Sequence, residues 1–151
     1  MDLLLVNIKR LDFKRTEDCD LLYDALYIDG ASILALSGKL GHELMDPEPT
    51  YDFLSSLDTV YTVGPYLVAY AIHMPWYSYD EVLCDLLVMR ITADTGSLSD
   101  VTDFLEAEAR ANNVKFVAVG TLLAPNDKAL VRAYERQGYS IAATQLVKEI
   151  T

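Results

Sequence analysis

A carboxylate stands inside an apolar segment of the sequence, EVLCDLLVMRI over residues 81–91. Asp85 interrupts the apolar run, and Glu81 precedes it. Burial disfavours the charged form of a carboxylate and raises its pKa, which makes the group a better base near neutral pH. Asp85 is therefore the first candidate for a general base, with Glu81 as the second. The competing interpretation of Asp85 is a carboxylate that accepts hydrogen bonds at a sheet edge.

Aromatic residues and carboxylates follow one another just before this segment. Trp76, Tyr77 and Tyr79 are succeeded by Asp80 and Glu81. Aromatic faces and carboxylates both attract cations, so this run is a candidate binding site for an ammonium group. Aromatic side chains that pack within a connecting loop would give the same pattern.

The histidines and cysteines do not suggest a metal site. His73 lies in a predicted strand whose register decides whether it faces the core or a cleft, and His42 lies in a region of uncertain structure. Cys19 and Cys84 are far apart and have no CxxC or histidine-rich context, so neither a zinc site nor a disulfide is indicated. Cys84 is expected to be a small buried apolar residue in a reducing cytoplasm.

Composition and charge narrow the class of protein. The 151 residues are 52% hydrophobic and 23% charged, which predicts a folded chain with a single domain over residues 1–151. No apolar run approaches the roughly 20 residues that span a bilayer, so we expect no membrane segment. The net charge of −11 opposes nucleic-acid binding and favours a cationic amine substrate or a basic protein partner.

The first half of the chain is predicted to contain two helices and three strands. A strand over residues 3–8 precedes a helix over 16–27, for which Thr16 is a candidate cap. A second helical stretch follows over residues 31–40. The two prolines of residues 46–49 predict an irregular loop. Residues 58–63 and 66–74 then read as a hairpin around Gly64 and Pro65.

The second half alternates strands and helices. Ser97 with Asp100 forms a possible capping box at the start of one helix, and Gly138 can end another. The expected elements are a strand over 81–91, a helix over 97–112, a strand over 114–120, a helix that begins near 125, and a strand over 140–150. This order predicts an α/β fold with a central mixed, mostly antiparallel sheet flanked by helices.

Residues 129–139, ALVRAYERQGY, resemble the helix signature A-x-x-x-Y-E-K-x-G-F of the GNAT superfamily of N-acetyltransferases. The resemblance implies a helix that packs beside acetyl-CoA. It also implies that Tyr134 is the general acid for the departing thiolate, because a hydroxyl near the sulfur can donate a proton. An aromatic side chain that merely packs against the sheet is the alternative interpretation of Tyr134.

Residues 83–96, LCDLLVMRITADTG, are similar to the central strand and pyrophosphate loop of the same superfamily. The positions in register are Asp85, Leu86, Val88 and Gly96. The resemblance implies a β-bulge whose main chain holds the acetyl thioester, and a loop and helix start that hold the pyrophosphate. The cofactor-binding residues that it implies are Leu87, Val88, Gly96, Ser97 and Asn126.

The resemblance implies an acetyl-CoA-dependent N-acetyltransferase that acts on a cationic primary amine, with Asp85 as base and Tyr134 as acid. Ala93 and Leu98 depart from the loop pattern, since Arg or Gln and then Gly or Ala are usual there. These departures favour the alternative, a fold of this family that serves as a structural or interaction subunit, for example in a phage virion. The location would then be the virion rather than the cytoplasm, and a homo-oligomer or larger assembly is compatible with either reading.

Overall fold

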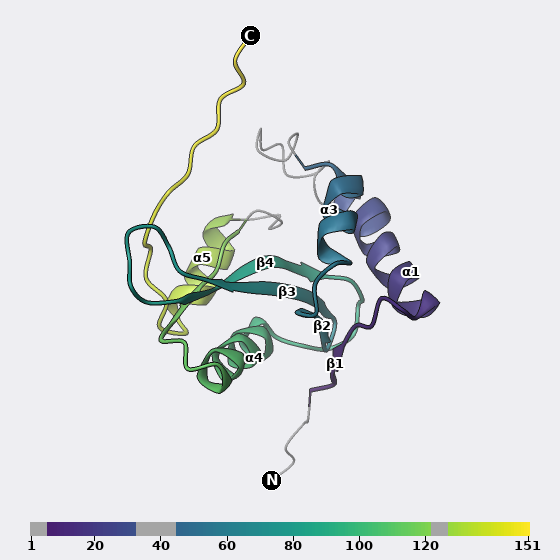
Figure 1. Cartoon of the computed structure of the whole chain (residues 1–151), viewed down its shortest axis with the longest axis horizontal. Helices are drawn as coiled ribbons and strands as arrows, with labels where there is room; N and C mark the ends of the chain where they lie inside the picture. Colours follow the sequence, from purple (N-terminus) through teal and green to yellow (C-terminus); the bar gives the residue numbers. More distant parts are fainter. Residues whose placement is uncertain (1–5, 33–44, 122–126) are drawn as a thin grey trace.

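The computed structural model describes residues 6–32, 45–121 and 127–151, and five strands in them form one sheet (Figure 1). The strands are β1 (Ile8–Arg10), β2 (Val60–Val63), β3 (Tyr66–His73), β4 (Val82–Arg90) and β5 (Phe116–Ala118). They lie in this order across the sheet. The pairs β1–β2, β2–β3 and β3–β4 are antiparallel, and the pair β4–β5 is parallel. The predicted mixed, mostly antiparallel sheet is thus confirmed.

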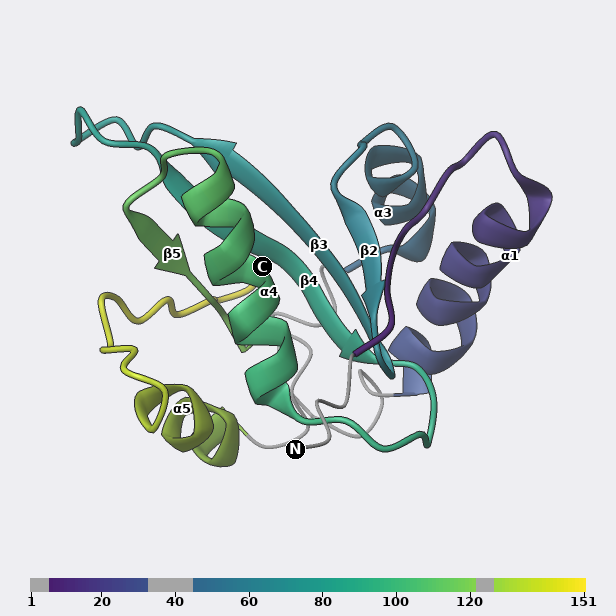
Figure 2. The same cartoon turned by 90° about the horizontal axis from the view of Figure 1, so that it is seen from below.

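Helices cover both faces of the sheet (Figure 2). On one face lie α1 (Thr16–Asp24), its continuation as the π-helix η1 (Ala25–Gly30), and α3 (Pro47–Leu54). On the other lie α4 (Leu98–Ala111) and α5 (Asp127–Glu135). None of the helices in the described ranges has the length and hydropathy that crossing a bilayer requires.

Two hydrophobic cores follow from the alternation of side chains along β3. Leu67 and Ala69 pack in the core beneath α1 and α3. Val68 and Tyr70 pack in the core beneath α4. Successive side chains of a strand point to opposite faces, so a strand that supplies both cores must be apolar at every position.

β4 changes this alternation at one point. Leu83 lies in the α4 core and Leu87 in the α3 core, although residues four apart in a regular strand share a face. The pairing with β3 explains the change, because Ala69 pairs with Leu87 and Tyr70 with Asp85. Leu86 is therefore the extra residue of a β-bulge, at the place where the sequence predicts one.

The local signals around α4 are also confirmed. Its buried side chains recur at helical spacing, and Ser97 and Asp100 form the expected capping box. The hairpin of β2 and β3 turns at Gly64, whose φ of 55° is in the left-handed region that glycine adopts readily.

The expected loop over residues 46–49 is instead the beginning of α3. Pro47 occupies the first turn, where a missing N–H costs no helical hydrogen bond. The Asp46 side chain accepts a hydrogen bond from the Glu48 backbone N–H at 3.1 Å and so caps the helix. The prolines at this position therefore start a helix rather than break one.

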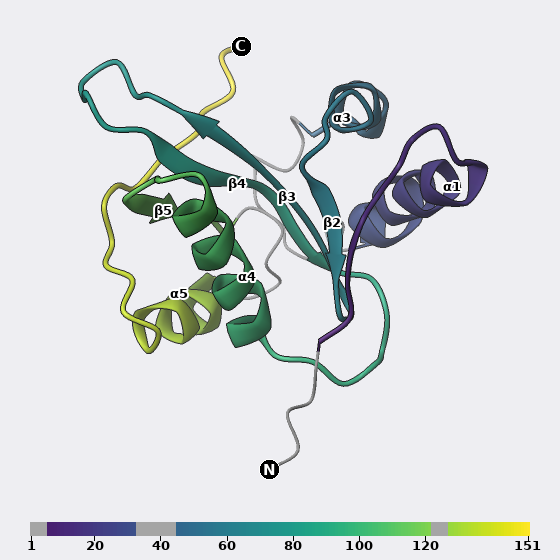
Figure 3. The same ribbon diagram turned by 60° about the horizontal axis from the view of Figure 1, so that its bottom comes forward.

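Both ends of the chain differ from the predictions. Residues 3–5 of the predicted first strand lie outside the described residues, and β1 begins at Ile8 because the segment from Ile8 to Arg10 pairs with β2. The expected strand over 140–150 is absent, and this segment runs away from the sheet as an exposed tail (Figures 1 and 3). Its large apolar residues 141, 146, 147 and 150 do not share one face of a strand, so pairing would not bury them together. Residues 33–40 of the expected second helix lie outside the described residues.

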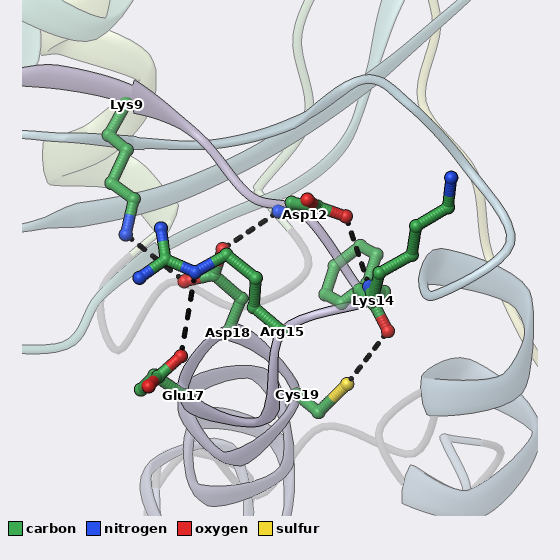
Figure 4. A network of polar contacts seen from close by, with 8 residues as sticks. Lys9, Asp12, Lys14, Arg15, Glu17, Asp18 and Cys19 are labelled. Atoms are coloured by element: carbon green, nitrogen blue, oxygen red, sulfur yellow. Dashed lines mark hydrogen bonds and ion pairs between the residues drawn. The ribbon is translucent and has the colours of Figure 1, made fainter.

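Asp18 joins β1 to α1 (Figure 4). Its carboxylate is 2% exposed and accepts hydrogen bonds from Lys9 Nζ at 3.1 Å and from the Asp12 backbone N–H at 2.8 Å. Burial acts to raise the pKa of Asp18, but these hydrogen bonds and the Lys9 charge outweigh it and hold the pKa below its usual value. Thr16, by contrast, is not the helix cap, since Arg15 holds that position without a side-chain cap.

We expect Asp18→Asn to lower the free energy of unfolding at pH 7 by roughly 1–3 kcal/mol, because hydrogen bonds to a charged group are lost. A depressed pKa stabilises the fold above the unfolded-state value and loses this effect as pH falls through the folded-state value. The gap between wild type and Asp18→Asn should therefore shrink below about pH 4. Urea unfolding across pH measures this, with the exposed Asp20→Asn on the same helix as control. Equal stability of Asp18→Asn and wild type at pH 7 would contradict the assignment.

Candidate functional site

Asp85 lies where β4 and β5 stop pairing. The parallel ladder ends with Cys84 opposite Ala118. Beyond it, the Asp85 carboxylate accepts hydrogen bonds from the Gly120 backbone N–H at 3.1 and 3.2 Å. Burial raises the pKa of Asp85 to about 6, and the hydrogen bond from Gly120 opposes this rise. Asp85 is thus both an acceptor at the sheet edge and a carboxylate whose pKa suits a general base.

Tyr134 of α5 is a buried side chain whose hydroxyl has no partner in the part of the chain that the structure describes. Its exposure is 4%, and its oxygen has no hydrogen bond among the described residues. Burial raises the pKa of Tyr134, and the charge of Asp85 raises it further. The hydroxyl therefore keeps its proton near neutral pH. Buried polar groups are nearly always paired, so an unpaired one beside a carboxylate of raised pKa is typical of a functional site.

Contacts with α4 hold α5 in place. The Thr102 hydroxyl hydrogen-bonds to the Gln137 side chain, and Tyr139 Oη donates to Glu106 at 3.2 Å. Gly138 has a φ of 93°, which lets the chain turn between these two contacts. These interactions fix the Tyr134 ring, whose centre is 5.7 Å from that of Tyr139.

The bulge in β4 places Leu86, Leu87 and Val88 in three different surroundings. Val88 packs on the α4 core, so its main chain rather than its side chain is left for a ligand, whereas Leu87 is buried in the α3 core and also lines the hollow described next. Leu86 is 39% exposed. It lines an open hollow of about 330 Å³, here called the α3–β4 groove, whose walls are Met45, Pro49, Thr50, Phe53, Leu54, Leu86 and Leu87.

The start of α4 is occupied by its own capping box. The Ser97 backbone N–H donates to the Asp100 carboxylate at 3.2 Å, and Ser97 Oγ contacts Ser99 Oγ at 2.6 Å. The positive end of the helix dipole is thereby already paired with a negative group. Asp94 brings a further carboxylate to the preceding loop.

Gly96 and Arg90 shape the same loop. A side chain at Gly96 would place its Cβ 2.4 Å from Pro65 Cδ, so packing against the β2–β3 turn requires glycine there. The Arg90 guanidinium donates to the backbone oxygens of Asp94 and Gly96 and lies 5.4 Å from the Tyr66 ring centre. Arg90 is therefore engaged in holding the loop.

The residues described here differ in how well they fit the two halves of the acetyl-CoA molecule that the resemblance implies. The unpaired Tyr134 hydroxyl, Asp85 and the bulge fit a thioester. The start of α4 does not fit a pyrophosphate, because Asp100 already accepts from Ser97, Asp94 adds negative charge and Arg90 is occupied.

The remaining candidates that the structure describes do not join this site. His73 and Glu81 are exposed, and His42 and Asn126 lie outside the described residues. Burial and the Asp85 charge raise the pKa of Cys84, which keeps its thiol protonated. The three aromatic residues of the β3–β4 connection do not reach the core, with exposures of 95% for Trp76, 74% for Tyr77 and 98% for Tyr79. Within the loop, the Trp76 and Tyr77 rings contact each other edge to face, with ring centres 5.5 Å apart.

Sequence reasoning missed Gly120, Arg90 and the groove-lining role of Leu86. Gly120 contacts a residue that lies 35 positions away in the chain, and Arg90 contacts backbone oxygens. Neither kind of contact leaves a local pattern of residue types in the sequence. A signal for Leu86 existed, since a bulge in an apolar strand must place two consecutive side chains on one face.

Comparison with solved structures identifies chains of the same shape. An aminoglycoside acetyltransferase from an uncultured soil metagenomic sample superposes with a TM-score of 0.59 at 9% identity, covering 98% of this chain and 100% of that one. A Pyrococcus furiosus protein with a provisional acetyltransferase assignment gives 0.59 at 15% identity, covering 97% and 100%. AAC(6')-Iy, in complex with a bisubstrate analogue of CoA and acetylneamine, gives 0.58 at 7% identity, covering 97% and 99%.

No protein-family model and no curated protein sequence matches the chain. The likeness therefore rests on the arrangement of helices and strands, which extends over nearly the whole length of each protein. It shows that this chain has the fold of these acetyltransferases, which is the GNAT fold that the resemblance in the sequence implies.

Proposed function

We propose that the protein transfers an acetyl group from an acetyl thioester, acetyl-CoA in the first place, to a primary amine. The observation that carries this proposal is the unpaired, buried Tyr134 hydroxyl near Asp85, at the point where the ladder between β4 and β5 ends. A proton donor and a proton acceptor with different pKa values in one place are what acyl transfer to an amine requires.

Asp85 and Tyr134 have separate tasks in this reaction. Asp85 takes a proton from the ammonium form of the acceptor, and the neutral nitrogen then forms a bond to the thioester carbonyl carbon. As the carbon–sulfur bond breaks, Tyr134 gives its proton to the sulfur and the nitrogen releases its second proton to solvent, so that the products are an amide and a thiol. The proton held by Asp85 then returns to the tyrosinate through solvent.

The acceptor is expected to be cationic before it reacts. A net charge of −11 attracts ammonium groups and repels nucleic acid, and a free amine or a basic protein would both be drawn to this surface. The cytoplasm, where acetyl-CoA is available, is the location that goes with this activity.

A second function is favoured by the start of α4. The capping box and two nearby carboxylates, Asp94 and Asp100, are poor surroundings for a pyrophosphate. A protein of this fold that binds no donor would serve as a structural or interaction subunit, including one of a phage virion. Donor binding separates the two proposals before any acceptor is known.

We expect acetyl-CoA and S-acetyl-pantetheine, which lacks the nucleotide and pyrophosphate, to bind with dissociation constants within about tenfold of each other. The reason is that the thioester end fits the site while α4 gives the pyrophosphate little attraction. Isothermal titration calorimetry of both compounds measures this. Absence of binding by both at millimolar concentration would end the acetyltransferase proposal and favour the second function.

The same titration should detect the effect of Asp100. Asp100→Asn removes one negative charge from the start of α4, so acetyl-CoA should bind roughly two- to fivefold more tightly while S-acetyl-pantetheine is unaffected. Asp103→Asn, an exposed change further along α4, is the matched control. An equal effect of both variants would mean that the pyrophosphate does not lie at the start of α4.

Tyr134→Phe and Tyr139→Phe should have opposite effects. Tyr134→Phe removes an unpaired hydroxyl, so thermal stability should be kept or raised while kcat falls roughly 10- to 100-fold. Tyr139→Phe loses the hydrogen bond to Glu106 but keeps the ring that packs beside Tyr134, so it should lower the melting temperature slightly and leave kcat nearly unchanged. Melting curves and steady-state rates test this pair. Unchanged turnover in Tyr134→Phe would remove Tyr134 from the reaction.

A further inference from the structure

We infer that the acceptor amine carries an apolar group and that the α3–β4 groove binds this group. The inference rests on the proposed acetylation of an amine and adds the class of acceptor. It differs from what the names of two similar structures say of those proteins, since aminoglycosides and neamine carry many hydroxyl and ammonium groups.

The lining of the groove is the first reason. Six of its seven residues are apolar, and none is charged. The seventh, Thr50, already donates its hydroxyl hydrogen to the Asp46 backbone oxygen at 2.7 Å. A ligand with many polar groups would lose hydration there without gaining partners, whereas an alkyl or aromatic group would gain from leaving water.

The position of the groove is the second reason. Leu86 lines it, and the neighbouring residue in the chain is the candidate base Asp85. The ladder between β4 and β5 has ended at Cys84, so the β5 side of β4 is unpaired from Asp85 onward. The Asp85 carboxylate lies toward α5, on the other face of β4 from the groove, so a ligand whose apolar end lies in the groove brings its amine to Asp85 past this unpaired side of the strand.

Charge complementarity gives the third reason. Helix α3 and its cap carry Asp46, Glu48 and Asp52 and no lysine or arginine. These carboxylates favour the approach of a single ammonium group, and the groove beside them then takes the apolar remainder. An apolar anion would be repelled from the same helix.

The ligand class is tested with a series of amines in the absence of any thioester. NMR of the Leu86 and Met45 methyl groups follows titrations with n-propylamine, n-butylamine and n-hexylamine, and with kanamycin as an aminoglycoside. We expect affinity to rise roughly two- to fourfold per added methylene, and kanamycin to leave these methyl signals in place. Binding that does not depend on chain length, or a response to kanamycin at lower concentration than to hexylamine, would overturn the inference.

Two phenylalanines of equal exposure provide matched variants. Phe53, 54% exposed, lines the groove, and Phe116, 53% exposed, lies on β5 outside it. Phe53→Ser should weaken hexylamine binding about tenfold, while Phe116→Ser should not change it. Equal weakening by both variants would contradict the groove as the binding site. If either variant fails to fold, the chain-length series on the wild-type protein still tests the inference.

The inference and the proposed function fail differently. Hexylamine that binds at Leu86 but is not acetylated with acetyl-CoA would contradict the acetylation and support the ligand class of the groove. Acetylation of small polar amines without any hexylamine binding would overturn the inference and leave the acetylation in place.

Discussion

One extra residue in β4, Leu86, determines how the two cores and the site fit together. The bulge that it forms moves Leu87 and Met89 into the α3 core and Val88 to the α4 core. Without it, every side chain after Asp85 would point to the opposite face, and neither core could pack as it does. The same bulge leaves unpaired main chain beside Asp85. One extra residue therefore determines both how the sheet packs and where the candidate site lies.

The side chains that complete the site come from distant parts of the chain. Asp85 reaches Gly120 after β5, and α5 is held against α4 by Thr102 and Tyr139. These contacts satisfy their polar groups and leave the Tyr134 hydroxyl buried without a partner in the described part of the chain. An unpaired buried hydroxyl lowers the stability of the fold. This one lies where the proposed reaction needs a proton donor, so function explains why the destabilising group is kept.

The sequence predicts the parts of this structure that depend on local patterns. The hairpin, the apolar strand β4 and the capped helix α4 have such patterns, and all three are confirmed. The prolines of α3 were misread because their effect depends on position within the first turn. The tail was misread because a strand needs a partner edge. Ser97 was expected both to form a capping box and to bind pyrophosphate, although the two roles compete for one N–H.

The central claim is that Asp85 is a base of raised pKa at a thioester site. Carbon-13 NMR of the labelled aspartate carboxyl groups, with and without S-acetyl-pantetheine, tests it most directly. The account predicts an Asp85 pKa of about 6 that rises further when the thioester excludes water. An Asp85 pKa near the ordinary value of about 4, or one that does not respond to the thioester, would contradict the account.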